Sequence, residues 1–324
     1  MKVSPKLDKS QVQELYRQMQ LIRQFEEECS RLYMQGKIRG FLHLYIGEEA
    51  VAVGAIPTLK PQDYIVSHYR DHGHALVRGL DPRAVMAELM GKATGTSGGR
   101  GGSMHLFDVS KGFWGGYAIV GGQMPIAVGL ALSAKLKKED RVTVCFFGDG
   151  AVNEGEFHES LNLAALWKLP IVFFLENNLY GMGSHVDKTH AVGRDLYLAA
   201  DPYRIPAAQV DGMDLLAVRE AAAEAVERVR SGGGPVFLEA MTYRFRGHSM
   251  ADPSAYREGS EVDLWAKKDP ILTFKEKMQE DGLLSEDEIA EIDDEIKEVI
   301  EDAVRFGDES PEPDLDSVYE HVYA

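Results

Sequence analysis

This sequence of 324 residues has few cysteines and fewer basic than acidic residues. The two cysteines, Cys29 and Cys145, are too few for a disulfide framework and fit a reducing compartment. Lysine and arginine number 35 against 52 aspartate and glutamate residues, a formal net charge of −17 that argues against nucleic acid or an anionic membrane as partner. No apolar run reaches the roughly 18 residues of a membrane span, and no secretory or transit signal precedes the first helical pattern, so we expect a cytoplasmic protein.

Internal repeats and Pro/Ser-rich linkers are also absent, and the length suits either one large α/β domain or two smaller ones. An amphipathic helix is expected at about 9–35, where apolar residues such as Leu15, Met19 and Ile22 recur at helical spacing. An acidic helix and tail are expected at about 285–324. The helix opens with a capping box at Ser285–Glu288, and its isoleucines at 289, 292, 296 and 300 should face inward.

The most informative pattern is Gly148-Asp149-Gly150, followed further along the chain by Asn177-Asn178. Residues 141–147 are β-branched and aromatic, as in a buried strand, residues 154–167 are good helix formers, and residues 171–175 form a second apolar run. Strand, helix and strand at this length form a βαβ unit, whose right-handed crossover makes the two strands parallel. Both polar motifs therefore leave the carboxyl edge of one sheet, where such folds bind ligands.

The residue types at this edge suit a metal-bridged diphosphate. Glycine beside Asp149 lets the backbone approach an oxyanion, and the amino end of the following helix offers free N–H groups to it. A carboxylate and the amide oxygen of Asn178 suit a hard divalent ion such as Mg²⁺, whose other positions phosphate oxygens can fill. The alternative is an aspartate that only caps the helix, and the strand context together with the paired asparagines favours the diphosphate site.

Two further strands end in charged side chains. A short strand at Tyr64–Ser67 leads into Tyr69-Arg70-Asp71-His72-Gly73, and a strand at Pro235–Thr242 leads into Arg244 and His248. If these strands share the sheet, their cationic groups could meet the diphosphate. Residues 94–122 are dense in glycine, which excludes an ordinary helix or a long strand and is typical of a functional loop.

A stripe of small residues marks the helix expected at about 125–137. Pro125, Gly129 and Ser133 lie four residues apart, so they share one face and permit the close approach of another helix. That helix could belong to the same chain or to another subunit, and the spacing favours neither.

These motifs resemble those of the alpha subunits of the thiamine diphosphate-dependent 2-oxo acid dehydrogenases, and most closely the pyruvate-specific, acetyl-transferring members. The similarity runs from about Leu15 to the tail and includes RGFLHLYIGEEAVAVG, SHYRDHGH, GGRGGSMHLF, AIVGGQMPIAVG, GDGAVNEGEFHESLNLAALWKLP, ENNLYGMG, VDGMD and TYRFRGHSMADP. It implies a single thiamine diphosphate-binding domain over residues 1–324, of the α/β class, with a central, mostly parallel sheet flanked by helices.

The resemblance also implies how the cofactor is held. Asp149, the side chain of Asn178 and the backbone carbonyl of Tyr180 would bind Mg²⁺. The backbone around Gly150 and Ala151 would contact the diphosphate. The side chains that would neutralise it are Arg70, Arg244 and His248, and Tyr69 would lie beside it.

Further positions match the rest of the cofactor site. Ala118 and Val120 would line the aminopyrimidine pocket, where Ala118 replaces a glycine common in the family and adds only a methyl group. His43 and His248 would face the reacting centre, although the apolar run around His43 also suits a core histidine. The resemblance leaves the roles of His72 and His105 open.

The reaction implied is the oxidative decarboxylation of pyruvate, with transfer of the acetyl group to the lipoyl arm of a dihydrolipoyl acetyltransferase. The thiazolium ring of the cofactor would supply the electron sink, and the protein would supply binding, orientation and proton transfer. In this family the glutamate that activates the aminopyrimidine comes from the beta subunit, and no residue here matches it. An α₂β₂ heterotetramer is therefore expected, and the chain alone should be inactive.

Acetoin dehydrogenase and branched-chain 2-oxo acid dehydrogenase alpha subunits remain alternatives. Tyr69, the segment Tyr180–Gly183 and the segment Ser249–Pro253 favour the pyruvate-specific members. A non-catalytic nucleotide-binding subunit is an alternative of another class. It would require a Gly-x-Gly-x-x-Gly turn, and Gly148–Asn153 lacks the third glycine.

Overall fold

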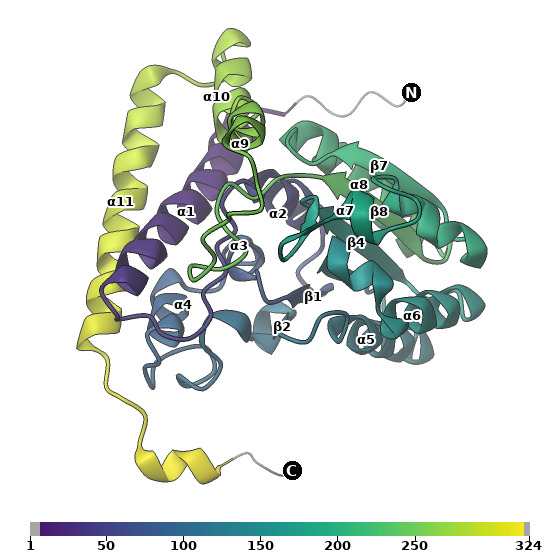
Figure 1. The fold of residues 1–324 in the computed structure, drawn as a ribbon, viewed down its shortest axis with the longest axis horizontal. Helices are drawn as coiled ribbons and strands as arrows, with labels where there is room; N and C mark the ends of the chain where they lie inside the picture. The colour runs from purple at the N-terminus through teal and green to yellow at the C-terminus, as the bar shows by residue number, and fades with distance from the viewer. Residues whose placement is uncertain (1–6, 321–324) are drawn as a thin grey trace.

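A single sheet of six parallel strands forms the centre of the molecule (Figure 1). The computed structural model describes residues 7–320. The strand order is β2-β1-β3-β4-β8-β7, and a small antiparallel hairpin, β5-β6, follows β4. The strands are β1 Tyr64–His68, β2 Phe113–Tyr117, β3 Thr143–Gly148, β4 Ile171–Asn177, β5 Tyr180–Gly181, β6 Ser184–His185, β7 Ala207–Asp211 and β8 Val236–Met241. The expected α/β fold with a central parallel sheet is confirmed.

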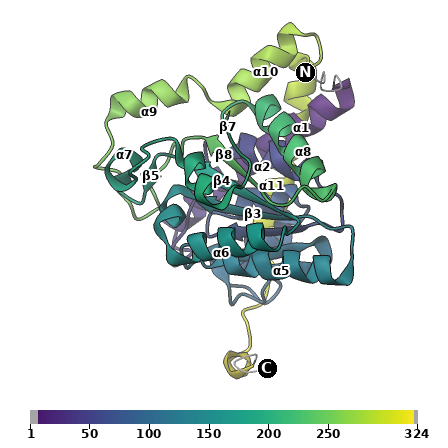
Figure 2. The same cartoon turned by 90° about the vertical axis from the view of Figure 1, so that its right-hand side faces the viewer.

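Helices cover both faces of this sheet (Figure 2). One face carries the pair α5 Gln123–Lys137 and α6 Gly155–Leu166. The other face carries the larger set, which is α1 Lys9–Met34, α2 Glu49–Ala55, α3 His72–Val77, α4 Pro82–Leu89, α8 Leu215–Arg230, α10 Pro270–Glu280 and α11 Glu286–Glu309. Two short helices, α7 Val186–Thr189 and α9 Gly259–Ala266, lie in the connections that follow β6 and β8. Among residues 7–320, none of the helices is both long enough and apolar enough to cross a membrane.

The central strands are buried on both faces, which explains their nearly continuous apolar sequences. Successive strand residues point to opposite faces of a sheet. Phe146 and Phe174 accordingly belong to the hydrophobic cluster beneath α1, α2 and α8, whereas Phe147 and Phe173 belong to the cluster beneath α5 and α6. Cys145 is a buried free thiol within β3, as expected, and Cys29 is a buried free thiol in α1.

The two terminal helices agree closely with the sequence patterns. The predicted first helix at 9–35 is α1, and it lies beside α11 (Figure 1). The capping box at Ser285 and Glu288 is present at the start of α11. The four isoleucines of α11 are buried, with 2–7% of their surface exposed; they are Ile289, Ile292, Ile296 and Ile300.

The small-residue stripe of α5 faces outward. Pro125 and Gly129 are exposed, and a Cβ added at Gly129 would meet no atom within 4 Å. Large apolar side chains are exposed on the same pair of helices, including Ile126, Leu136 and Leu166. No element of the described chain packs on the stripe at Gly129, which excludes simple internal packing there.

The glycine-dense segment 94–122 contains a short strand, β2, that its composition did not indicate. Two glycines within β2 are required by space. A Cβ at Gly115 would lie 2.1 Å from the ring of Phe107, and one at Gly116 would lie 2.0 Å from Oδ2 of Asp71. Glycine in β2 therefore marks close packing of neighbouring groups rather than a flexible loop.

The earlier part of the same segment folds around one carboxylate. Glu88 of α4 is fully buried, and its two oxygens accept backbone N–H groups at 2.7–3.0 Å. The donors are Ser97, Gly99, Gly101 and Gly102. These bonds satisfy the carboxylate with backbone donors, and they give a glycine-rich backbone a fixed course.

Candidate active site

Five of the six parallel strands bring predicted site residues to one edge of the sheet. Tyr69 and Arg70 follow β1, Ala118 and Val120 follow β2, Asp149, Gly150 and Ala151 follow β3, Asn178 and Tyr180 follow β4, and Arg244 and His248 follow β8. Because the strands are parallel, these positions all lie at its carboxyl edge, where open α/β sheets bind ligands. The expectation that Asp149 and Asn178 leave the same edge is confirmed.

Asp149 is a buried carboxylate at the start of the short 3₁₀ turn Asp149–Asn153. Its Oδ2 atom has no hydrogen-bond partner within residues 7–320, and a Cβ built on Gly181 would lie 3.6 Å from it. The carboxylate thus lies against the backbone of β5. Burial raises the pKa of Asp149 to about 7, against the opposing effects of Arg244 and Arg70. A buried, unpartnered carboxylate of this kind is costly unless a cation reaches it.

The residues after β4 turn sharply because one of them adopts a left-handed conformation. Leu179 has φ +73°, which an L-residue rarely adopts. Asn177 fixes this turn, since its side chain accepts the N–H of Leu179 and donates to the buried carboxylate of Glu239 at 2.6 Å. The first asparagine of the pair is therefore structural, and the second, Asn178, is free to face the site together with the carbonyl of Tyr180.

Arg244 shows that these oxygens converge. The side chain is fully buried, and its guanidinium donates to Oδ1 of Asn178 at 3.4 Å and to the carbonyl oxygens of Tyr180 at 3.3 Å and Met182 at 2.6 Å. The oxygens of Asn178 and Tyr180 that the resemblance assigns to a metal thus already contact one cationic group. The two contacts are long, so these oxygens could be shared with a second cation.

The donor set at this edge fits a hard divalent ion. It offers the unpartnered Oδ2 of Asp149, an amide oxygen and a backbone carbonyl, all of which are oxygen donors. Within residues 7–320, no group of three or more His, Cys, Asp and Glu side chains is placed to hold a metal. A metal at this edge would consequently depend on oxygens from a bound ligand to complete its coordination.

A second cluster brings three aromatic side chains and one guanidinium together. The ring of His43 lies 4.5 Å from that of Tyr69 and 5.0 Å from that of His248, measured between ring centroids. Arg70 is buried beneath them and donates to the carbonyl oxygens of Leu44 at 2.7 Å and His248 at 2.9 Å. His43 is only 6% exposed, but its Nδ1 atom has no hydrogen-bond partner in the described chain, which a satisfied core histidine would have.

Both imidazoles of this cluster are neutral at neutral pH. Burial, with the nearby Arg70 guanidinium, lowers the pKa of His43 to about 2. Burial, with Arg70 and Arg244, lowers the pKa of His248 to about 3. An anion bound beside them would raise both pKa values, because an opposite charge favours the protonated form. The cluster is therefore suited to an anionic ligand.

Other predicted positions lie further from these contacts. Ala118 directly follows Tyr117, which pairs with His68 at the end of β1, and the side chain of Val120 is 40% exposed. Of the two histidines with open roles, His72 is fully buried between Glu26 and Ser103, with 2.9 Å from Nδ1 to Oε2 of Glu26. His105 lies 3.0 Å from the carbonyl oxygen of Gly116. Both histidines contact backbone carbonyl oxygens of the segment 94–122, at Ser103 and Gly116.

A buried polar layer beneath the site was missed by the sequence interpretation. Glu176, the residue before the asparagine pair, contacts Nε2 of His68 at 2.5 Å and Nε2 of His74 at 3.0 Å, and it accepts the hydroxyl of Tyr45. Burial alone would raise the pKa of Glu176, but the two imidazoles hold it below its ordinary value. A glutamate at the end of the apolar run 171–175 was the available signal, since such a carboxylate must find partners when buried.

Glu48 is the second missed carboxylate, and it contacts the site directly. It is fully buried, accepts Nδ2 of Asn178 at 3.1 Å, and lies 3.5 Å from Nε of Arg70. Two adjacent glutamates, Glu48 and Glu49, inside an apolar run were the sequence signal.

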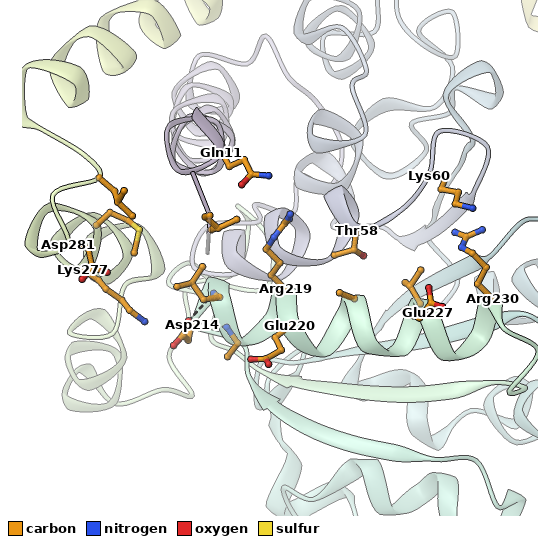
Figure 3. A pocket seen from close by; sticks show the side chains of 17 residues that line it. Gln11, Thr58, Lys60, Asp214, Arg219, Glu220, Glu227, Arg230, Lys277 and Asp281 are labelled. Carbon is orange, nitrogen blue, oxygen red and sulfur yellow. Dashed lines mark hydrogen bonds between the residues drawn. The ribbon is translucent and has the colours of Figure 1, made fainter. Parts of the chain in front are cut away.

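A groove of the described chain lies away from this edge. It has a volume of about 1080 Å³ and runs between α8, α10 and the start of α1, as Figure 3 shows. Arg219 of α8 points into it, near Gln11 and Thr58. None of the predicted site residues lines it.

Comparison with known proteins identifies the family of this chain. The family model described as dehydrogenase E1 component matches residues 17–316. The chain is 47% identical over 308 residues to the pyruvate dehydrogenase E1 component subunit alpha of Rhizobium meliloti (strain 1021), covering 95% of this chain and 88% of the relative. The protein of the same name from Porphyra purpurea is 44% identical, and the alignment covers 98% of this chain and 94% of the relative. The pyruvate dehydrogenase E1 component subunit alpha-3, chloroplastic, of Arabidopsis thaliana is 47% identical, and the alignment covers 96% of this chain and 74% of the relative. The resemblance inferred from the motifs is confirmed, and the chain belongs to the dehydrogenase E1 component family.

Proposed function

We propose that this chain is the alpha subunit of the first component of a pyruvate dehydrogenase complex. It would catalyse, with thiamine diphosphate, the oxidative decarboxylation of pyruvate and the transfer of the acetyl group to a lipoyl-bearing dihydrolipoyl acetyltransferase. The observation that carries the proposal is the convergence of Asp149, Asn178, Tyr180 and Arg244 at one sheet edge, in a chain of this family.

In this proposal Mg²⁺ is held by Asp149, by Oδ1 of Asn178 and by the carbonyl oxygen of Tyr180. The metal and the nearby guanidinium groups would neutralise the diphosphate, which is contacted by Tyr69, Arg70, Gly150, Ala151, Arg244 and His248. Burial of the two arginines supports this role, because a desolvated guanidinium gains most from a charge-assisted bond to an anion.

The remaining roles concern the organic part of the cofactor. Ala118 and Val120 would line the aminopyrimidine pocket, and His43 and His248 would face the reacting centre. When bound, the thiazolium ring supplies the electron sink for the loss of CO₂. The Nδ1 atom of His43 has no partner among the described residues, and an anion bound beside it would raise the lowered pKa of His43 toward the range that proton transfer needs.

We further propose that residues 1–324 form one domain that works only within an α₂β₂ heterotetramer. The outward stripe on α5 and the exposed apolar residues around it support a subunit interface, since exposed apolar patches commonly mark such contacts. The beta subunit would contribute the glutamate that activates the aminopyrimidine. Two buried free cysteines fit a cytoplasmic location.

The test is a comparison of substrates with the assembled enzyme. The chain is co-expressed with its beta partner, and reduction of an artificial electron acceptor is measured with pyruvate, acetoin and branched 2-oxo acids. The proposal predicts the highest kcat/KM with pyruvate, and no decarboxylation by the purified chain alone. Preference for acetoin or a branched acid would overturn the substrate assignment, and robust turnover by the chain alone would overturn the need for a partner.

A further inference from the structure

We propose that His68 is a positioning residue that holds the turn after β1, and with it the guanidinium of Arg70, in the conformation that receives a diphosphate. The inference rests on the proposed function, and it concerns a residue that acts through Arg70 rather than one that touches the cofactor. His68 is the last residue of β1 and is 8% exposed. The buried polar layer alone does not explain it, because only one of its two nitrogens contacts Glu176.

The two ring nitrogens of His68 have different partners. Nδ1 accepts the backbone N–H of Arg70 at 3.1 Å, and this is the only hydrogen bond of that N–H within residues 7–320. An N–H group always donates, so Nδ1 carries no proton and the ring is neutral, with its proton on Nε2. Nε2 donates to Oε2 of Glu176 at 2.5 Å. Burial lowers the pKa of His68, which agrees with a neutral ring.

The ring therefore connects the backbone after β1 to a fixed point on β4. The second oxygen of Glu176 contacts Nε2 of His74 at 3.0 Å and accepts the hydroxyl of Tyr45. Strands β1 and β4 lie on either side of β3, so the connection passes across β3. A carboxylate with three such partners is held firmly in place, and His68 thereby fixes the N–H of Arg70.

The position of this N–H matters because both residues of the turn face the proposed diphosphate site. The ring of Tyr69 lies 5.7 Å from that of His248, measured between ring centroids. The guanidinium of Arg70 donates to the carbonyl oxygens of Leu44 and of the same histidine. Those two contacts hold the end of the arginine side chain, whereas His68 holds its backbone. Without His68, diphosphate binding would first have to order the turn, which lowers affinity.

Two substitutions at His68 separate the roles of its two nitrogens. An asparagine side chain places an oxygen near the position of Nδ1 and commonly accepts the N–H two residues further on, but it is too short to reach Glu176. A glutamine side chain extends toward Glu176 as Nε2 does, but it has no acceptor near the position of Nδ1. We expect His68→Gln to weaken thiamine diphosphate binding about 10-fold and His68→Asn to stay within about threefold of the parent, because only the first leaves a buried N–H unpaired. Calorimetry of the assembled enzyme at saturating Mg²⁺ measures both affinities.

Hydrogen exchange of the assembled enzyme without cofactor gives a second readout. The amide of Arg70 should exchange faster in His68→Gln than in the parent, and at the rate of the parent in His68→Asn. The matched control is His74→Phe, which removes another contact of Glu176 but leaves the bond between His68 and Arg70. Its affinity for thiamine diphosphate should equal that of the parent.

The order of the two His68 variants distinguishes positioning from packing. A role in packing alone predicts the reverse order, because glutamine is closer to histidine in size and keeps the contact with Glu176. Parent-like affinity and exchange in His68→Gln would overturn the inference, and so would an equal loss of affinity in His68→Asn or in His74→Phe. A parent enzyme that binds no thiamine diphosphate in the presence of Mg²⁺ would overturn the proposed function itself.

Discussion

The helical layer formed by α1 and α11 differs from the carboxyl edge of the sheet in where its charged side chains lie. Where α11 packs on α1, the charged groups stay at the surface and pair there, as in the Lys9–Glu288 contact of 2.7 Å, while Ile296 and the other isoleucines fill the interface. At the sheet edge ionisable groups are inside, where Asp149, Glu48 and Arg70 have between 0 and 3% of their surface exposed.

The first region stabilises the fold, whereas the second lowers the stability of the fold and serves binding. The helical layer pairs charged side chains at its surface and caps α11 with Ser285 and Glu288. The sheet edge leaves buried oxygens of Asp149 and Glu48 without hydrogen-bond partners among the described residues. Buried groups of this kind disfavour folding, and they are typical of sites where a ligand supplies what the protein lacks.

The largest expected effect is at the metal ligands. Asn178→Ala and Asp149→Ala should each abolish Mg²⁺-dependent binding of thiamine diphosphate, because an octahedral site tolerates the loss of a ligand poorly. Calorimetry of the assembled enzyme with and without Mg²⁺ measures this. Unchanged cofactor affinity in both variants would show that the buried oxygens of the sheet edge do not serve metal-dependent binding, and the contrast between the two regions would fail.

The next effect should appear in the helical layer. Ile296→Ala removes a side chain that is 2% exposed, and we expect a loss of about 2–5 kcal/mol in the free energy of unfolding. Denaturant titration measures it, and cofactor affinity in the folded fraction should not change. A loss below about 1 kcal/mol would show that the isoleucine stripe does not hold α11 in place.

A smaller effect, of opposite sign, is expected at Asp149 in the cofactor-free protein. The folded-state pKa of Asp149 is raised from 3.8 to about 7, so between these values the unfolded chain ionises while the folded chain stays protonated. Stability is therefore lost as pH rises through this window. Asp149→Asn removes the effect, and the variant should become more stable than the parent by on the order of 2–4 kcal/mol above pH 7, with a much smaller difference near pH 4. Thermal melts across this pH range test it, and a pH-independent difference would contradict the assignment.

The smallest effect concerns the cap of α11. Ser285 accepts the N–H of Glu288, and Ser285→Ala should cost about 1 kcal/mol of stability, since one N–H of the first turn loses its partner. Matched measurements on Ser285→Asn should show little loss, because asparagine also caps helices well. Equal destabilisation by both substitutions would point to packing rather than capping.

Some elements of the structure could be predicted because they depend only on the sequence pattern within one short segment. The isoleucine spacing and capping box of α11 depend on residues within one helix, and the βαβ unit around Asp149 and Asn178 depends on one short segment. Both were predicted correctly. The outward stripe of α5 was left open, because spacing cannot say which side of a helix faces the core.

Tertiary structure explains what could not be predicted. Glu48 meets Asn178 because the loop before α2 reaches the end of β4, and Glu176 meets His68 because the sheet order places β1 and β4 on either side of β3. Strand β2 was missed because its glycines, normally a sign of a loop, are imposed by Phe107 and Asp71. Contacts across the sheet leave little trace in the local sequence.

The most direct test of the account is to locate a divalent ion. Crystals of the assembled enzyme grown with thiamine diphosphate and Mn²⁺ in place of Mg²⁺ would give an anomalous difference map. The account predicts one strong peak within about 2.2 Å of Oδ2 of Asp149, Oδ1 of Asn178 and the carbonyl oxygen of Tyr180, with the diphosphate completing the coordination. Bound thiamine diphosphate with no peak at these three oxygens would contradict it.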